Sequence, residues 1–258
     1  MALVEMILQG KGGKTLVASL LTQHYKDLGV ETVCIDADPV NPTFSGYKAL
    51  GVERVELMNG KKINPKRFDG LVGKIIAAPE NSAVIVDNGA SSFVALCSYL
   101  LEYDALSVLK RLGHRVRLHT VVTGGQGLTD TLVGFDALCR SFPEAPVILW
   151  KNEYFGALRD KNGTKFEDLN VYKKHGGRLE GEILLPEVER ETVGEDMDAM
   201  LVRRMTFREA IDGDEFFIMS RQRLTMYWHN MDERMKRAQL WGPPKKALSN
   251  KRAAGNPA

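Results

Sequence analysis

The stretch Leu8-Gln9-Gly10-Lys11-Gly12-Gly13-Lys14-Thr15-Leu16 decides the fold prediction for this chain. It follows a short apolar segment that begins at Val4, and it precedes a segment, 16–28, whose apolar residues recur at helical spacing. A glycine-rich turn between a strand and a helix, ending in Gly-Lys-Thr, is typical of a phosphate-binding loop. Backbone N–H groups of the glycines can approach phosphate oxygens, Lys14 would reach the outer phosphates, and the Thr15 hydroxyl would bind magnesium.

Strand-like and helix-like segments alternate along the rest of the chain. This alternation predicts an α/β fold in which a doubly wound, mostly parallel sheet is flanked by helices, with a helical C-terminal region from Asp196 onward. We expect one domain over residues 1–241 and a basic, disordered tail over residues 242–258. The predicted strands after the first are residues 32–36, 82–87, 115–122, 147–150 and 179–185, and the predicted helices include 92–112 (as one or two helices), 128–142 and 216–240.

Composition narrows the class of protein. The 258 residues are 44% hydrophobic and 26% charged with a net charge of +2, which fits a globular protein and argues against a general nucleic-acid coat protein. The three cysteines have no zinc or disulfide spacing, so we expect reduced core residues in a cytoplasmic protein. We also expect neither a signal peptide nor a membrane span. The cysteines are Cys34, Cys97 and Cys139.

Unusual polar residues follow most of the predicted strands, where open parallel sheets bind ligands. Asp36 and Asp38 end the second strand and Asp87 ends the third, while the segments 123–126 and 151–152 follow the fourth and fifth. An aspartate at the position of Asp87 would hold the hydration shell of a metal ion, and Asp38 is placed to orient an attacking water. These residues predict a nucleoside triphosphate site at one edge of the sheet.

Three of these motifs resemble those of a known family. Gly10-Lys11-Gly12-Gly13 followed by Lys14-Thr15 is similar to the deviant Walker A motif of the ParA/MinD P-loop ATPases. Asp36-Ala37-Asp38-Pro39 resembles the first switch segment of that family, and Val84-Ile85-Val86-Asp87 resembles its Walker B strand.

Longer segments resemble the TraL branch of that family, which consists of conjugal-transfer proteins of mobile plasmids. They are residues 35–44, 87–93 and 119–126, and the resemblance as a whole extends from about Val4 to Gln239. It implies a cytoplasmic protein of plasmid conjugation that binds ATP and Mg²⁺, forms a nucleotide-dependent homodimer and works with other transfer proteins.

The resemblance also implies a role for each matching residue. Lys11, Lys14 and Asp38 would be catalytic, with Lys11 reaching the phosphates of the partner subunit and Asp38 positioning the hydrolytic water. Thr15 and Asp87 would hold the metal. The nucleotide would contact Gly10, Gly12, Gly13, Lys14, Thr15, Asn152 at the adenine edge and the backbone near Pro186.

The loop departs from the family pattern, which has two more residues between Gly13 and Lys14. A register in which Leu8 opens the loop restores the length but displaces Lys11. ATPase activity therefore depends on whether the short loop is competent, and the alternative is an adaptor that keeps the fold but has a disabled nucleotide site. Binding of a dinucleotide is less well supported, because Thr15 stands where that motif needs its third glycine.

The segment 221–237 is basic on one side and apolar on the other. A packed helix with a solvated face is the usual explanation of such a pattern. Non-specific contact with DNA, which ParA-type dimers often make through surface basic residues, is the functional alternative.

Overall fold

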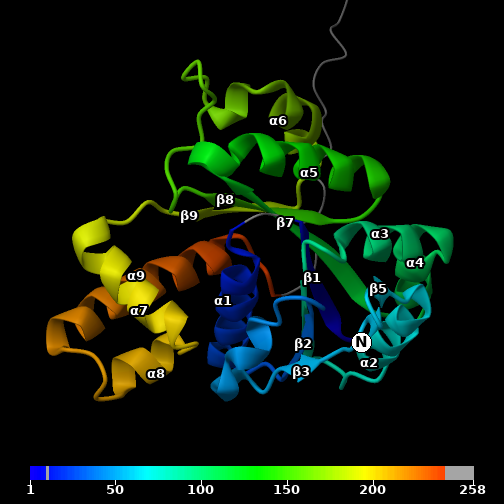
Figure 1. Ribbon diagram of the computed structural model, residues 1–258, viewed down its shortest axis with the longest axis horizontal. Helices are drawn as coiled ribbons and strands as arrows, with labels where there is room; N and C mark the ends of the chain where they lie inside the picture. Colours follow the sequence, from blue (N-terminus) through cyan, green and yellow to red (C-terminus); the bar gives the residue numbers. More distant parts are fainter. Residues whose placement is uncertain (10–11, 242–258) are drawn as a thin grey trace, which may run out of the picture.

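A seven-stranded sheet forms the centre of the computed structural model, which describes residues 1–9 and 12–241 (Figure 1). Every neighbouring pair of its strands is parallel, so the predicted fold class is confirmed. In spatial order the strands are β3 (Glu53–Arg54), β2 (Thr32–Ala37), β6 (Ala83–Asn88), β1 (Leu3–Gln9), β7 (Arg115–Thr123), β8 (Val147–Asn152) and β9 (Gly181–Leu185).

Helices cover both faces of the sheet (Figure 1). One face packs against α1 (Lys14–Asp27), α7 (Glu195–Val202), α8 (Phe207–Asp212) and α9 (Ile218–Arg237). The other face packs against α2 (Phe68–Ile76), α3 (Phe93–Glu102), α4 (Ala105–Arg111) and α5 (Leu128–Ser141), and α6 (Asn170–His175) lies outside α5.

The side chains of β1 alternate between these two layers. Leu3 and Ile7 pack on the α1 side, whereas Val4, Met6 and Leu8 pack on the side of α2 and α3. This follows from the two-residue repeat of a strand. A central strand buried on both faces is apolar on both, which explains why β1 is apolar from Leu3 to Leu8 except at Glu5.

The sequence prediction left two regions open. Residues 44–81 carry no strong periodicity, and they form short 3₁₀ turns, the edge strand β3, the hairpin of β4 (Met58–Asn59) and β5 (Lys62–Ile63), and α2. The segment 92–112, predicted as one or two helices, forms two, because Asp104 adopts a left-handed conformation (φ 48°) between α3 and α4.

All three cysteines are free and buried, as expected. Helix α9 buries one face and exposes the other, and its Arg223 and Lys236 form ion pairs with Asp196 and Asp232. Within residues 1–9 and 12–241, no helix is long and apolar enough to cross a membrane. The predicted tail, 242–258, lies outside the described residues.

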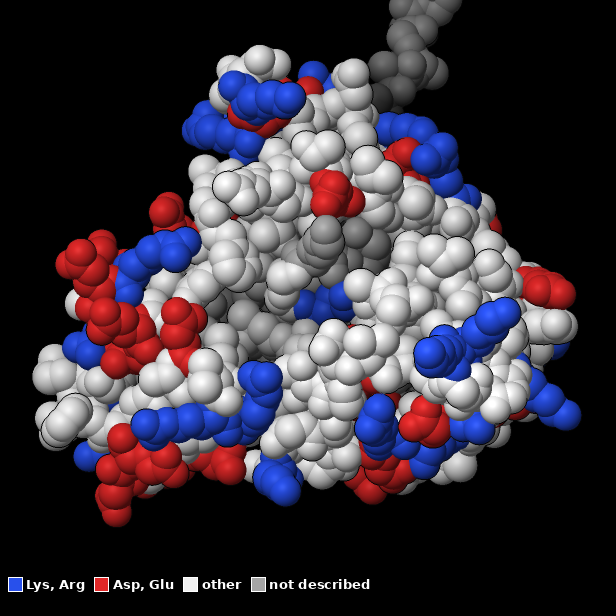
Figure 2. Space-filling view, in the orientation of Figure 1, with Lys and Arg blue, Asp and Glu red and all other residues white. Residues whose placement is uncertain are grey.

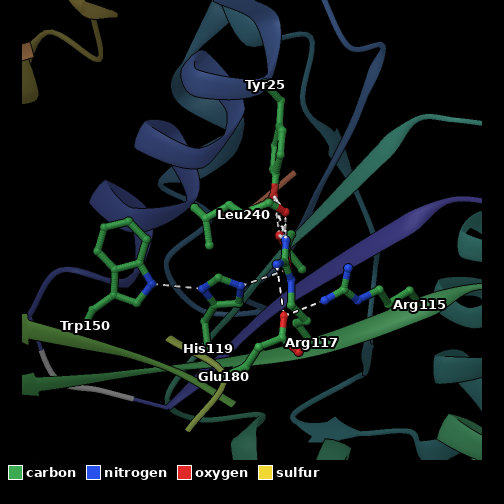
Figure 3. Close-up of polar contacts among 8 residues, drawn as sticks. Tyr25, Arg115, Arg117, His119, Trp150, Glu180 and Leu240 are labelled. Carbon is green, nitrogen blue, oxygen red and sulfur yellow. Dashed lines mark hydrogen bonds and ion pairs between the residues drawn. The ribbon is translucent and has the colours of Figure 1, made fainter. Parts of the chain in front are cut away.

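A cluster of buried charges lies between the sheet and α1, centred on Glu5, and is called here the Glu5 cluster (Figure 3). Arg117 donates to both carboxylate oxygens of Glu5, and Tyr25 donates to one of them. Arg117 also donates to the carbonyl of Leu240, which joins the segment after α9 to the sheet. On its other side Arg117 contacts Glu180 at 3.3 Å.

His119 completes the cluster and its tautomer can be deduced. The indole of Trp150 lies 2.9 Å from Nδ1 of His119 and can only donate a hydrogen bond. Nδ1 is therefore the acceptor, and the ring proton sits on Nε2, which donates to Glu5 across 2.9 Å. Each polar group of the cluster thus has a partner in the protein.

Candidate functional site

A pocket lies at the carboxyl ends of the central strands, beside the start of α1, with a cavity volume of about 330 Å³. Figure 2 shows this face of the molecule hollowed near its centre, with a basic side chain at the floor. The glycine loop, the ends of β2, β6 and β8, and the end of α7 surround the cavity. Its lining is Gly12, Gly13, Lys14, Thr15, Leu16, Asp38, Asn41, Thr43, Tyr47, Asp87, Asn88, Asn152, Tyr154, Phe155, Asp198, Leu201 and Arg204.

The glycine loop is shaped by two left-handed residues. Gly12 has φ 72° and Gly13 has φ 114°, conformations that side-chain-bearing residues rarely adopt. The Gly13 carbonyl accepts the first hydrogen bond of α1, from the N–H of Val17 at 2.8 Å. The helix therefore begins immediately after the second glycine, with its positive end at the pocket.

The length of the loop follows from the ends of β1 and α1. Strand β1 continues to Gln9 and α1 begins at Lys14, so four residues connect them. Leu8 lies in the strand with a buried side chain, and the structure does not support the register in which Leu8 opens the loop. Gly10 and Lys11, both predicted site residues, lie outside the described residues.

Thr15 and Asp87 form a direct contact in the pocket. The Thr15 hydroxyl donates to Oδ2 of Asp87 at 2.7 Å, although the two residues are 72 positions apart. Oδ1 of Asp87 is buried and has no hydrogen-bond partner within the described part of the chain. A hydroxyl and a carboxylate with a spare buried oxygen are hard donors of the kind that Mg²⁺ prefers, so these residues fit the ion that the resemblance implies.

Burial controls the charges of Asp87 and Lys14. It raises the pKa of Asp87 to about 7, because the hydrogen bond from Thr15 offsets the loss of water only in part and Asp36 adds a like charge. Burial also lowers the pKa of Lys14, and the nearby carboxylates Asp87 and Asp38 counter this decrease. Burial thus disfavours the charged form of both groups in the pocket.

Asp36 and Asp38 have different roles at the end of β2. Asp36 is fully buried and accepts the N–H groups of Asp38 at 3.0 Å and Ser45 at 2.8 Å, so it fixes the course of the chain. Asp38 lines the pocket, and its Oδ1 accepts the N–H groups of Val40 and Asn41.

Gly89 makes room for the carboxylate of Asp38. A Cβ at Gly89 would lie 2.8 Å from Oδ2 of Asp38 and closer still to the other carboxylate atoms. The glycine after β6 therefore lets the ends of β2 and β6 bring Asp38 and Asp87 into one pocket.

Asn152, at the end of β8, holds the glycine loop from the other side. Its Nδ2 donates to the carbonyl of Gly12 at 3.3 Å, and its Oδ1 accepts the N–H of Tyr154. The Thr123 hydroxyl donates to the same Gly12 carbonyl at 3.2 Å. Asn152 is buried in these contacts and also lines the pocket, whereas Pro186 is not among the lining residues.

The motif Gly124-Gly125 supports the loop that follows β8. A Cβ at Gly124 would lie 2.8 Å from the carbonyl oxygen of Ala157, and one at Gly125 would lie 2.6 Å from that of Phe155. The two glycines thus allow close backbone packing, and this packing holds the Phe155 ring against Gly12. Their role is to position a wall of the pocket.

The pocket residues that sequence reasoning missed include Tyr47, Tyr154, Asp198 and Arg204. Tyr154 donates to Asp198 at 2.8 Å, which joins the loop after β8 to α7. None of these residues belongs to a motif of the sequence. The left-handed conformation of Arg204 (φ 56°) is a local signal, but it is visible only in the structure.

Comparison with known proteins gives two relatives of high similarity, each called Protein TraL and each from Escherichia coli. One is 43% identical over 238 residues, which cover 91% of this chain and 98% of the relative. The other is 45% identical over 227 residues, which cover 87% of this chain and 93% of the relative. No family model matches the chain.

Solved structures give weaker matches. A chain of the MinC:MinD cell division protein complex of Aquifex aeolicus is 13% identical, with a TM-score of 0.47, over 95% of this chain and 98% of that chain. A nucleotide-binding protein of Archaeoglobus fulgidus in complex with ADP is 15% identical, with a TM-score of 0.43, over 79% of this chain and 87% of that chain. At these scores neither likeness decides the function.

Proposed function

The chain belongs to the family of TraL proteins, and from this premise we propose that it is a magnesium-dependent ATP-binding protein of plasmid conjugation. ATP binding would favour a homodimer, and the dimer would have a different affinity for other transfer proteins. The nucleotide then acts as a switch, with slow hydrolysis returning the protein to its monomeric form. Cytoplasmic location and non-specific DNA contact through α9 remain predictions of the same kind.

One observation carries the proposal: the contact of Thr15 with Asp87, next to Lys14. A buried carboxylate with an unsatisfied oxygen is costly unless something binds it. Mg²⁺ would be bound by the Thr15 hydroxyl and, through water, by Asp87, and it would supply charge neutralisation for the β- and γ-phosphates. Lys14 would bind the outer phosphates, and Asp38 would orient the attacking water.

The alternative is an interaction protein with the same fold and a disabled site. The short connection between β1 and α1 supports it, because only four residues are available to surround a phosphate. The left-handed Gly12 and Gly13 favour the ATP-binding proposal instead, since such conformations bring backbone N–H groups close to a ligand.

Titration of the full chain with ATP and Mg²⁺ tests the proposal. We expect saturable binding that requires Mg²⁺, and an increase in molecular mass to that of a dimer when ATP is present. The same measurements on a chain with Val-Gly inserted after Gly13 show what the short loop contributes. Binding by neither chain would overturn the proposal, and binding by the longer chain alone would favour the disabled site.

A further inference from the structure

We propose that Arg204 is a second phosphate-binding cation of this pocket, held in place by a strained helix end. The inference rests on the proposed ATP site and adds to it a residue outside the phosphate-loop and aspartate motifs. Arg204 follows α7 and lines the cavity together with Leu201 and Asp198.

The end of α7 has the hydrogen bonds of a Schellman motif. The N–H of Arg204 donates to the Leu201 carbonyl at 3.1 Å, and the N–H of Met205 donates to the Met200 carbonyl at 3.1 Å. This motif places one residue in the left-handed region, and Arg204 occupies that position with φ 56°. Glycine is the usual residue there, because a side chain makes the conformation unfavourable.

Two other helices of the chain end in the same way but use glycine. Gly29 after α1 and Gly113 after α4 make the equivalent hydrogen bonds, and a Cβ at either position would meet open space. Residues with side chains also adopt the left-handed conformation after α3 and α9, at Asp104 and Gln239, but neither of these lines the pocket. Arg204 combines this strained conformation with a place in the pocket lining, which favours a role for its side chain there.

The side chain of Arg204 is held in position and keeps donors to spare. Its stem packs beside Gly46, where an added Cβ would lie 3.0 Å from Cγ of Arg204. Nη1 donates to the Leu201 carbonyl at 2.6 Å, which uses one of the five N–H donors of a guanidinium. The group can therefore bind an anion without losing its own support.

The surroundings favour the phosphate chain as the partner. Lys14 and Arg204 are the two basic residues in the described lining, and they face the acids Asp38, Asp87 and Asp198. Tyr47 also lines the pocket; burial raises its pKa, while the charges of Arg204 and Asp87 act on its phenol in opposite directions. The planar guanidinium of Arg204 suits a phosphate.

Two variants of Arg204 test this assignment by calorimetric titration with MgATP. Arg204→Gln keeps the stem and the helix end but removes the charge, and Arg204→Gly removes the strain as well. We expect each to weaken MgATP binding about tenfold or more, with a melting temperature no lower than that of the wild type for Arg204→Gly. Gln239→Gly is the matched control, because Gln239 has φ 54° after α9 and does not line the pocket.

Competition by pyrophosphate identifies the part of the nucleotide that is bound. We expect Arg204→Gln to weaken the binding of pyrophosphate by the same factor as the binding of MgATP. Gln239→Gly should change neither affinity. If the wild type binds MgATP and both Arg204 variants bind it with an affinity within twofold of the wild-type value, this inference is overturned and the proposed function is not. Unchanged pyrophosphate competition would overturn the phosphate assignment, and a wild type that binds no MgATP would overturn the proposed function together with this inference.

Discussion

The Glu5 cluster and the pocket both contain buried carboxyl groups from the same sheet, but the pKa values of these carboxyls shift in opposite directions. In the cluster, burial alone would raise the pKa of Glu5, yet the charge of Arg117 and the hydrogen bonds from His119 and Arg117 lower it to about 2. In the pocket, the pKa of Asp87 rises to about 7, and one of its oxygens has no partner among the described residues.

We expect this difference to separate charges that stabilise the fold from charges that bind a ligand. A buried carboxylate whose oxygens are all bound stabilises one conformation, because removing any partner leaves a charge without solvation. A buried carboxylate with an oxygen that has no partner destabilises the folded protein, and a bound cation removes that destabilisation. Four changes test this distinction, from the largest expected effect to the smallest.

Glu5→Gln should cause the largest loss of stability. It removes the fully buried carboxylate partner of Arg117 and leaves that buried guanidinium with the partly exposed Glu180, so we expect the free energy of unfolding to fall by about 3–5 kcal/mol. Urea unfolding of both proteins measures the change. Glu180→Gln is the control and should cost less, because Glu180 is partly exposed. A loss below about 1 kcal/mol for Glu5→Gln would mean that the cluster is not structural.

Asp87→Asn should stabilise the protein at high pH in the absence of metal. The raised pKa of Asp87 means that the folded state binds the proton more tightly than the unfolded state, so stability is lost as the pH rises from about 4 to about 7. Asparagine does not titrate. The unfolding free energy of the variant should therefore rise relative to that of the wild type by about 2–3 kcal/mol between pH 5 and pH 8. Urea unfolding in EDTA at both pH values measures it, and a constant difference would contradict the raised pKa.

Lys14→Ala should change binding rather than stability. We expect affinity for MgATP to fall by about 1.5–3 kcal/mol, the usual value of a hydrogen bond to a charged group. The melting temperature should not fall, because burial already disfavours the charged form of Lys14. Lys26→Ala is the control on the same helix, since Lys26 donates to the Ala49 carbonyl on the surface. Equal affinity of the two variants for MgATP would exclude Lys14 from the site.

Gly89→Ala should have the smallest effect. The new Cβ would displace the Asp38 carboxylate and its bonds to the backbone of residues 40 and 41, at a cost of about 1 kcal/mol in unfolding free energy. Gly73→Ala in α2 is the control with the opposite sign, because a Cβ there meets nothing and alanine favours helix. Thermal unfolding distinguishes the two variants. A higher melting temperature in both would show that Gly89 does not make room for Asp38.

Much of the fold could be predicted from local patterns. The strands β1, β2, β6, β7 and β8 are rich in apolar and β-branched residues and lie between turn residues, and their alternation with helices indicates a parallel sheet. Segment 44–81 could not be predicted, because its short elements are stabilised by packing against the sheet and not by their own periodicity.

Some residues of the candidate site could likewise be predicted from the sequence, and others could not. The sequence by itself determined the glycine loop, Lys14, Thr15, Asp38 and Asp87, because a phosphate loop and strand-ending aspartates are local patterns with known chemistry. Only the tertiary structure decided that Thr15 meets Asp87, that Gly124 and Gly125 support the wall at Phe155, and that Arg204 joins the pocket. Such contacts join residues far apart in the chain, so they depend on how the helices pack on the sheet and leave no periodic signal in the sequence.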